Sequence, residues 1–172
     1  MRLAHVNGAT MPKSDRKSIE VIARGVLIDE TGRVLVCVNR KHEYGYLPGG
    51  HVEFGEAAGD AAVREFAEET GLAVRTAAVL AAGEERFEAG GSEYHEINVV
   101  FHVEHMSDGR PAPPPLTVQS LEPKIEFRWV SSAELPEMDF RPGTVKAWLW
   151  GWMRGGGSKA GPMSWLVANS TK

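Results

Sequence analysis

The clearest alternation of apolar and polar residues lies in residues 94–104. Ile97, Val99, Phe101 and Val103 fall on one side of an extended chain, whereas the intervening positions are mostly polar. This period of two is typical of a half-buried β-strand. Residues 125–130 alternate in the same way and predict another strand.

Strands are also predicted over residues 20–29, 34–39 and 73–87, which are rich in apolar residues. The segment Glu30-Thr31-Gly32-Arg33 has the composition of a turn, so the first two of these strands are predicted to form a hairpin.

Two segments have the features of helices. Between Glu56 and Gly71 the chain contains no proline and is mostly Ala and Glu, and Gly71 suits the position just after a helix. Residues 143–154 carry apolar side chains at helical spacing, namely Val145, Trp148, Leu149 and Trp152. Trp150 lies outside this stripe and is a candidate homodimer contact.

The order of these elements predicts the organisation of the chain. We expect a flexible N-terminal arm (residues 1–17), one domain (18–154) and a Gly-rich link with a C-terminal tail (155–172). The proline-rich residues 108–123 form a long loop, of a length that is usually functional or disordered. Strands that flank one helix and precede a second predict an α/β fold with a mixed sheet between helices.

Composition narrows the function classes. A chain of 172 residues with 42% hydrophobic residues supports one domain with a sizeable core. The net charge of −4, with no basic arm or stripe, argues against a nucleic-acid partner. We expect no membrane partner, because no apolar stretch has the length of a leader or a membrane span. The single Cys37 lies in an apolar run, which predicts a buried reduced thiol and agrees with a cytoplasmic location.

Three glutamates crowd one face near the end of the first predicted helix. At about 100° per residue, Glu65, Glu68 and Glu69 share a narrow arc. Their mutual repulsion, and their position where the helix dipole disfavours anions, both destabilise a helix. A hard divalent cation reverses both penalties, because clustered carboxylates are its usual ligands. The cluster therefore predicts a Mg²⁺ or Mn²⁺ site.

The surrounding spacing resembles the signature of the Nudix hydrolases. Gly50 is followed after five residues by Glu56, and after seven more by the run Arg64-Glu65-Phe66-Ala67-Glu68-Glu69-Thr70-Gly71-Leu72. All specified positions of the signature are occupied over residues 50–72, although Phe66 stands where aliphatic residues are commoner. The resemblance implies the α/β/α sandwich of that family.

The resemblance also implies a role for each matched residue. Glu65 and Glu69 would bind the metal, and Glu68 would be a further ligand or the general base. The backbone carbonyl of Gly49 would complete the metal shell, and Gly50 would permit close approach of the backbone. Arg64 would orient the glutamates through charge-assisted hydrogen bonds. Glu56 would support the start of the helix or the metal ligands rather than bind the metal directly.

Residues outside the signature are also candidates. A further acid often completes such sites in the family, and Glu96 and Glu126 lie on the polar sides of predicted strands. Arg40, Tyr46 and Gly50 are candidate substrate-binding residues, with Arg24 as a further candidate for holding a phosphate. The aromatic residues Tyr44, Tyr46, Phe87 and Tyr94 suit either base stacking or core packing.

The resemblance implies a metal-dependent hydrolase that cleaves the diphosphate bond of a nucleoside diphosphate linked to another group, by attack of water on phosphorus. The alternatives are a non-catalytic nucleotide-sensing domain, an isomerase of prenyl diphosphates and an enzyme that removes RNA caps. The sequence leaves open the nucleotide derivative, the phosphorus attacked, the general base, the number of metal ions and the oligomeric state.

Overall fold

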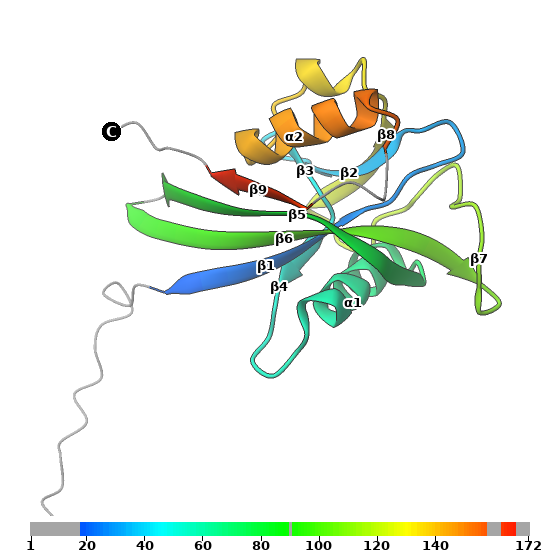
Figure 1. Cartoon of the computed structure of the whole chain (residues 1–172), viewed down its shortest axis with the longest axis horizontal. Coiled ribbons are helices and arrows are strands. Elements are labelled where there is room, and N and C mark those ends of the chain that lie inside the picture. The colour runs from blue at the N-terminus through cyan, green and yellow to red at the C-terminus, as the bar shows by residue number, and fades with distance from the viewer. Residues whose placement is uncertain (1–17, 90, 158–162, 168–172) are drawn as a thin grey trace, which may run out of the picture.

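The structure is a computed structural model that describes residues 18–89, 91–157 and 163–167. The arm predicted over residues 1–17 lies outside these described residues. Figure 1 shows two α-helices on opposite sides of a central sheet, with a smaller sheet beside the second helix.

The central sheet is mixed. Its strands follow the spatial order β4 (Gly49–His51), β1 (Ile19–Val26), β6 (Ser92–Ser107), β5 (Val74–Ala89) and β9 (Ser164–Val167), and β7 (Arg110–Pro111) pairs with β6. The pairs β1–β6 and β5–β9 are parallel, and the other pairs are antiparallel. The smaller antiparallel sheet has the order β3 (Gly45–Tyr46), β2 (Val34–Asn39) and β8 (Ile125–Val130).

Helix α1 (Ala58–Thr70) covers one face of the central sheet (Figure 1). Its buried residues Ala62 and Phe66 pack with Ala23, Phe101 and Val103 of the sheet. Phe66 fits because Gly25 has no side chain, since a Cβ there would lie 2.3 Å from the Phe66 ring. The helix ends as predicted, with Gly71 in the left-handed conformation.

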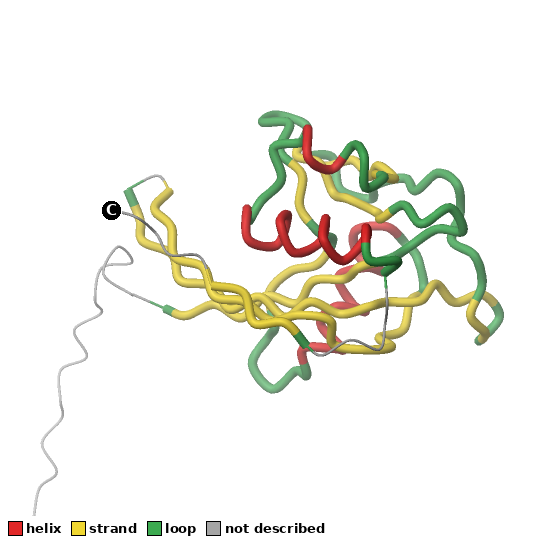
Figure 2. The backbone as a smooth tube through the Cα atoms, turned by 45° about the horizontal axis from the view of Figure 1, so that its top comes forward, coloured by secondary structure: helices red, strands yellow, loops and turns green. Residues whose placement is uncertain are grey.

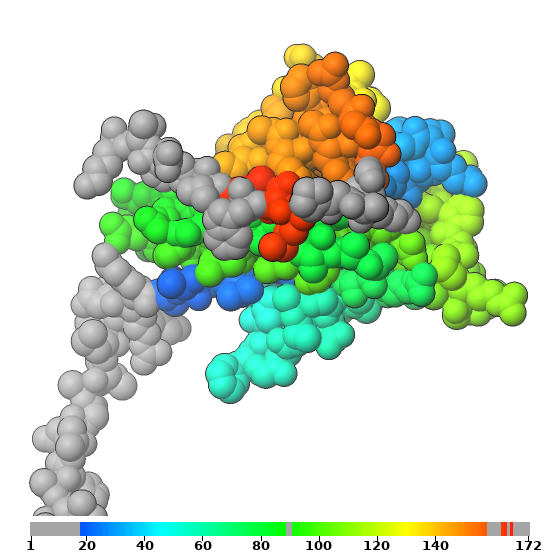
Figure 3. Space-filling model, viewed as in Figure 1, coloured from blue at the N-terminus to red at the C-terminus, as the bar shows by residue number. Residues whose placement is uncertain are grey.

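Helix α2 (Gly143–Arg154) and the smaller sheet cover the opposite face of the central sheet. Leu149 and Val145 pack there with Val36 of β2 and Val100 of β6 in a second core cluster. A short 3₁₀ helix (Leu135–Glu137) precedes α2. These layers confirm the predicted α/β/α arrangement, and the space-filling view shows them as successive layers (Figure 3).

The prediction that the first two strands form a hairpin is correct at the turn and wrong beyond it. At the turn, the amide of Asp29 donates to the carbonyl of Arg33 at 3.0 Å, and Leu35 donates to Leu27 at 3.0 Å. Further along, β1 joins the central sheet and β2 joins the smaller one. The reason is that both edges of β1 are taken by distant strands, β4 and β6.

The C-terminal region contains a strand that the sequence pattern did not predict. Strand β9 pairs in parallel with β5, and Gly83 of β5 makes room for Leu166, since a Cβ at Gly83 would lie 2.9 Å from the Leu166 side chain. Of the tail predicted as flexible, residues 158–162 and 168–172 lie outside the described residues.

The strands β5 and β6 extend far beyond the helices as a paired ribbon (Figure 2). No helix in the described part of the chain is long and apolar enough to cross a membrane.

Candidate functional site

Arg64 holds the acidic residues of α1 and its approach loop together. Its Nε and Nη2 atoms donate to the two carboxylate oxygens of Glu56 at 2.9 and 3.1 Å. Its Nη1 atom donates to Glu65 at 2.8 Å and to Glu68 at 3.2 Å. Glu56 and Glu65 raise the pKa of the guanidinium, with the hydrogen bonds to Glu56 as the largest cause. The structure thus brings together Arg64 and the acids that the sequence places around it.

The strand before the helix leaves room for one of these carboxylates. A Cβ atom built on Gly50 would lie 2.5 Å from the Cδ atom of Glu65. Only glycine therefore allows the backbone of β4 to approach the Glu65 carboxylate this closely.

Glu69 is buried, with only 5% of its surface exposed. Its carboxylate accepts a hydrogen bond from the amide of Gly49 at 3.2 Å. Burial raises the pKa of Glu69 to about 7, and the charges of Glu65 and Glu122 act in the same direction. The Gly49 amide and the positive charge of Arg24 oppose this rise. A buried carboxylate with a raised pKa among other acids is typical of a functional site.

Arg24 binds the backbone at the start of β4, where Gly49 lies. Its Nη1 atom donates to the carbonyl of Gly49 at 2.7 Å and to that of Leu47 at 3.2 Å. The guanidinium lies 5.4 Å from the centre of the Tyr46 ring. The Gly49 carbonyl, predicted as a metal ligand, thus accepts a hydrogen bond from Arg24 in this structure.

The oxygen donors suit a hard divalent cation, although their side chains are not gathered around a common point. Among the described residues, no three His, Cys, Asp or Glu side chains form a group that could hold a metal ion as placed. Arg64 instead bridges Glu65 and Glu68. The space left by Gly50 for Glu65 and the unfavourable burial of the Glu69 charge both fit a cation among these oxygens.

Two acids predicted as further ligands are engaged elsewhere. Glu126 pairs with Arg40 at 3.5 Å and with Arg128. Glu96 lies opposite Glu85 in the sheet and accepts a hydrogen bond from Asn98 at 3.4 Å. Burial lowers the pKa of Arg24 and the charge of Glu96 opposes this, so Glu96 acts on the residue that binds the Gly49 carbonyl.

Glu122 is an acid near the site that the sequence analysis did not identify. The amide of the preceding Leu121 donates to the backbone carbonyl of Glu69 at 2.8 Å, so this loop lies against the end of α1. The charge of Glu122 contributes to the raised pKa of Glu69. The only signal in the sequence was its position in the long loop 108–123.

The other predicted binding residues are separated. Arg40 donates from Nε to the carbonyl of Ile125 at 2.8 Å, which holds it against β8. Tyr46 lines a cleft of about 520 Å³ together with Arg24, Tyr44, Phe87 and others. Of the predicted substrate contacts, Tyr46 thus lies near Arg24. Gly50 lies near Glu65.

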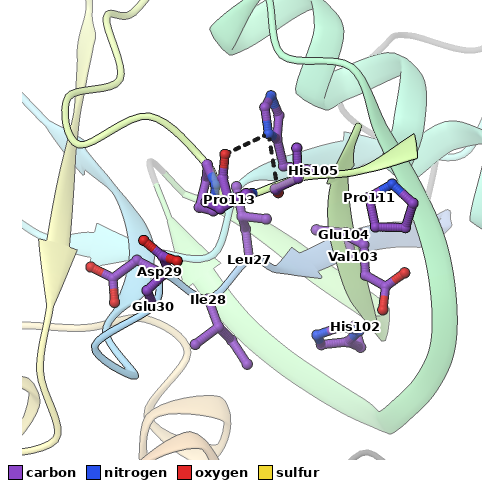
Figure 4. Close-up of a pocket in the computed structure, with 12 residues that line it drawn as sticks. Leu27, Ile28, Asp29, Glu30, His102, Val103, Glu104, His105, Pro111 and Pro113 are labelled. Carbon is purple, nitrogen blue, oxygen red and sulfur yellow. Dashed lines mark hydrogen bonds between the residues drawn. The ribbon is translucent and has the colours of Figure 1, made fainter. Parts of the chain in front are cut away.

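A second cavity of about 440 Å³ lies between β6, the turn after β1 and the proline-rich loop (Figure 4). The Nδ1 atom of His105 lies 3.0 Å from the carbonyl oxygen of Pro113, as Figure 4 shows. Two acids of this cavity are neutralised locally, Asp29 by Arg33 and Glu104 by Arg75. Since no signature residue lines this cavity, we do not assign the active site to it.

Two residues outside the cluster bear on earlier predictions: Cys37 on the isomerase alternative and Trp150 on the homodimer contact. Cys37 is buried, as predicted, and burial raises its thiol pKa to about 12. This environment is unsuitable for the catalytic cysteine expected of a prenyl diphosphate isomerase. Trp150 is 38% exposed, and its Nε1 atom donates to the carbonyl of Ser132 at 3.0 Å.

Comparisons with known proteins identify the family and the fold of this domain. Residues 19–149 match the family model of the NUDIX domain. Among solved structures, a MutT protein from Methanosarcina mazei is 21% identical with a TM-score of 0.62, covering 83% of this chain and 98% of that chain. A NUDIX hydrolase from Nitrosomonas europaea is 20% identical with a TM-score of 0.59, covering 89% and 81%.

An ADP-ribose pyrophosphatase from Streptococcus suis is 15% identical with a TM-score of 0.55, covering 85% of this chain and 98% of that chain. At these identities the structural likeness concerns the fold. A comparison with curated protein sequences gave no match.

Proposed function

Because this chain belongs to the Nudix hydrolase family, we propose that it uses Mg²⁺ or Mn²⁺ to hydrolyse the diphosphate bond of a nucleoside diphosphate linked to another group. The observation that carries this proposal is the arrangement of Arg64 with Glu65 and Glu68 on helix α1 and with Glu56 in the loop before it. Three carboxylates share one guanidinium there, and a divalent cation would offset the negative charge that remains.

The metal would be held by Glu65 and Glu69, with the carbonyl of Gly49 as a further ligand, which leaves Glu68 to accept a proton. Once bound, the metal would neutralise charge on the diphosphate oxygens and lower the pKa of a coordinated water. Glu96 and Glu126 are weaker candidates for additional ligands, because their carboxylates are engaged with Asn98 and with Arg40 and Arg128.

The protein's own residues position the reacting groups. Arg64 fixes the carboxylate of Glu65 from one side, and Gly50 leaves the space in which that carboxylate lies. Glu68, whose side chain is 57% exposed, accepts a proton from the attacking water. A bond then forms between the water oxygen and phosphorus, the bridging P–O bond breaks, and the leaving phosphate carries away its electron pair.

The cleft lined by Tyr44 and Tyr46 would hold the nucleoside. It adjoins the site through Arg24, which lines the cleft and also binds the Gly49 carbonyl. Tyrosine rings offer stacking faces for a base. Arg40 is a further candidate for phosphate contact, and its pairing with Glu126 at 3.5 Å is weak enough to exchange.

A substrate panel tests this proposal. Purified protein is incubated with Mg²⁺ or Mn²⁺ and with nucleotide sugars, dinucleotides, (d)NTPs and ADP-ribose, and the phosphomonoester product is measured. We expect metal-dependent product from at least one substrate, lost in Glu69→Gln and retained in Glu30→Gln, which changes an exposed glutamate outside the site. Tight nucleotide binding without product from any substrate would instead support the sensing domain.

Two further assignments remain predictions with their own tests. We infer a cytoplasmic location from the single buried thiol of Cys37, to be tested by cell fractionation. We infer that Trp150 contributes to a homodimer, to be tested by sedimentation of Trp150→Ala beside the native protein.

A further inference from the structure

The cleft beside Arg24 has an acidic end. It is formed where the ribbon of β5 and β6 passes β3 and the start of α2, and its walls include the aromatic residues Tyr44, Tyr46 and Phe87. Glu85 and Glu96 lie on the ribbon and line the same cleft.

These two glutamates occupy directly opposed positions. Glu96 of β6 is the register partner of Glu85 on β5 and of Glu20 on β1, so three carboxylates form one row across the sheet. Burial raises the pKa of Glu85, and the charge of Glu96 adds to this rise. Like charges placed opposite one another destabilise a sheet. The row therefore lowers the stability of the sheet and places hydrogen-bond acceptors at the acidic end of the cleft.

Neither of the two arginines that line the cleft, Arg24 and Arg141, forms a close ion pair with these glutamates in the described chain. Arg141 donates to both carboxylate oxygens of Asp139, at 3.2 and 2.8 Å, and lies 4.4 Å from the centre of the Tyr44 ring. Arg24 donates to the backbone carbonyls of Leu47 and Gly49; burial lowers the pKa of its guanidinium, and the charge of Glu96 opposes this through space. Within the described chain, neither arginine forms a salt bridge with Glu85 or Glu96.

Asn98 adds an unsatisfied acceptor to the same face of β6. It is only 2% exposed, and its Nδ2 atom donates to Glu96 at 3.4 Å. Its Oδ1 atom is buried and has no hydrogen-bond partner among the described residues. A buried acceptor without a partner is costly, so a ligand or water that donates hydrogen bonds is favoured here.

The position of this end relative to Arg24 indicates which part of a substrate reaches it. Arg24 pairs with Val100, and Glu20 pairs with Glu96, so the two rows are four residues apart on both strands. This corresponds to roughly 13 Å along the sheet. With the diphosphate near Gly49, an extended nucleotide would have its sugar along the cleft and its base at the acidic end.

We propose that Glu85 and Glu96 select nucleotides whose base carries an exocyclic amino group, namely adenine, cytosine or guanine. This inference rests on the proposed function and names the substrate class for that site. Ionised carboxylates only accept hydrogen bonds, so they bind an amino group and repel a carbonyl oxygen at the same position. Sites that hydrogen-bond a substrate N–H reject analogues without it strongly, and we expect a preference of at least ~10-fold.

Matched nucleotide pairs test the selection. Calorimetry with Mg²⁺ compares CDP with UDP, and GDP with IDP, since cytosine has an amino group where uracil has a carbonyl, and guanine has an amino group that hypoxanthine lacks. The specificity constants for CDP-glucose and UDP-glucose give the same comparison in turnover. We expect the amino-bearing partner to bind at least ~10-fold more tightly and to be hydrolysed preferentially.

Variants distinguish a specific role from a structural one. Glu85→Gln and Glu96→Gln can donate as well as accept, so each should reduce the preference to less than about half its native value while the protein stays folded. Glu30→Gln is the matched control and should keep the native preference. Equal binding of both members of each pair, or an unchanged preference in both variants, would overturn the inference.

The outcome is separable from that of the proposed function. If no nucleotide derivative is hydrolysed but CDP and GDP still bind more tightly than UDP and IDP, the proposed function fails and the selection stands. If hydrolysis is observed without any preference, the selection fails and the proposed function stands.

Discussion

Gly50 and Glu65 are complementary in shape, because a Cβ at Gly50 would lie 2.5 Å from the Cδ atom of the Glu65 carboxylate. The strand and the helix can meet at this distance only when one partner lacks a side chain. This contact links the geometry of the backbone directly to the position of a predicted metal ligand.

Gly50→Ala should therefore displace the Glu65 carboxylate and weaken metal binding by at least ~10-fold, since supporting contacts of metal ligands are typically worth that much. The measurement is Mn²⁺ titration by calorimetry. Gly151→Ala is the control, because nothing lies within 4 Å of a Cβ at that position. Equal Mn²⁺ affinity in the two variants would contradict a role of Gly50 in positioning Glu65.

Arg64→Lys should lower kcat by ~10- to 100-fold while keeping a positive charge at the position. Arginine makes hydrogen bonds to Glu56, Glu65 and Glu68 together, and a lysine ammonium cannot reproduce this planar arrangement. Steady-state kinetics at saturating Mg²⁺ measures the effect. Arg128→Lys, at an exposed ion pair, is the control and should stay within about twofold of the native kcat.

Glu68→Gln and Glu69→Gln should each lower kcat by at least ~10²-fold with little loss of folding, because each removes a catalytic or metal-binding charge. Turnover is measured on the best substrate of the panel, and circular dichroism checks the fold. Native turnover in either variant would remove that glutamate from the proposed mechanism.

The stability of the metal-free protein should fall as the pH rises from about 4.5 to 7. Glu69 has a pKa of about 7 in the folded protein against 4.5 for its ordinary value, so in this range the folded state holds a proton that the unfolded state has lost. The loss is at most on the order of 3 kcal/mol and is complete above the higher pKa. Urea unfolding at several pH values measures it.

Glu69→Gln supplies the comparison, because a neutral amide at this position does not titrate. The variant should lose this contribution to the pH dependence and be more stable than the metal-free native protein at pH 8. If native and variant proteins show parallel stability curves from pH 4.5 to 8, the buried charge of Glu69 does not have the proposed cost.

Cys37 should resist alkylation in the folded protein at pH 8, because its thiol is buried and its pKa is raised to about 12. Mass spectrometry after iodoacetamide treatment should show modification only when denaturant is added. Rapid modification of the native protein would contradict this environment.

Local signals in the sequence predicted several elements well. Helix α2 (Gly143–Arg154) and strand β8 (Ile125–Val130) have the predicted bounds, and α1 ends before Gly71 as expected. These elements carry their own period and boundary residues. The family signature also identified the helix that brings Arg64 beside its acids.

Contacts between distant segments could not be predicted in this way. Alternation marks a strand but not its partner, so the pairing of β1 with β4 and β6 was missed. Strand β9 was missed because so short a strand depends on β5 for its stability. The proximity of Glu122 to Glu69 likewise depends on the path of a long loop.

Strand β1 presents Ala23 to the helix α1 and the next residue, Arg24, to the cleft. On the proposed assignment, chemistry and recognition would use opposite surfaces of one sheet, with the long β5–β6 ribbon (Figure 2) supplying much of the recognition surface. Substitutions on that ribbon can accumulate during evolution and alter substrate preference while the hydrolytic helix stays unchanged. A lineage with this architecture can acquire new substrates without rebuilding its catalyst.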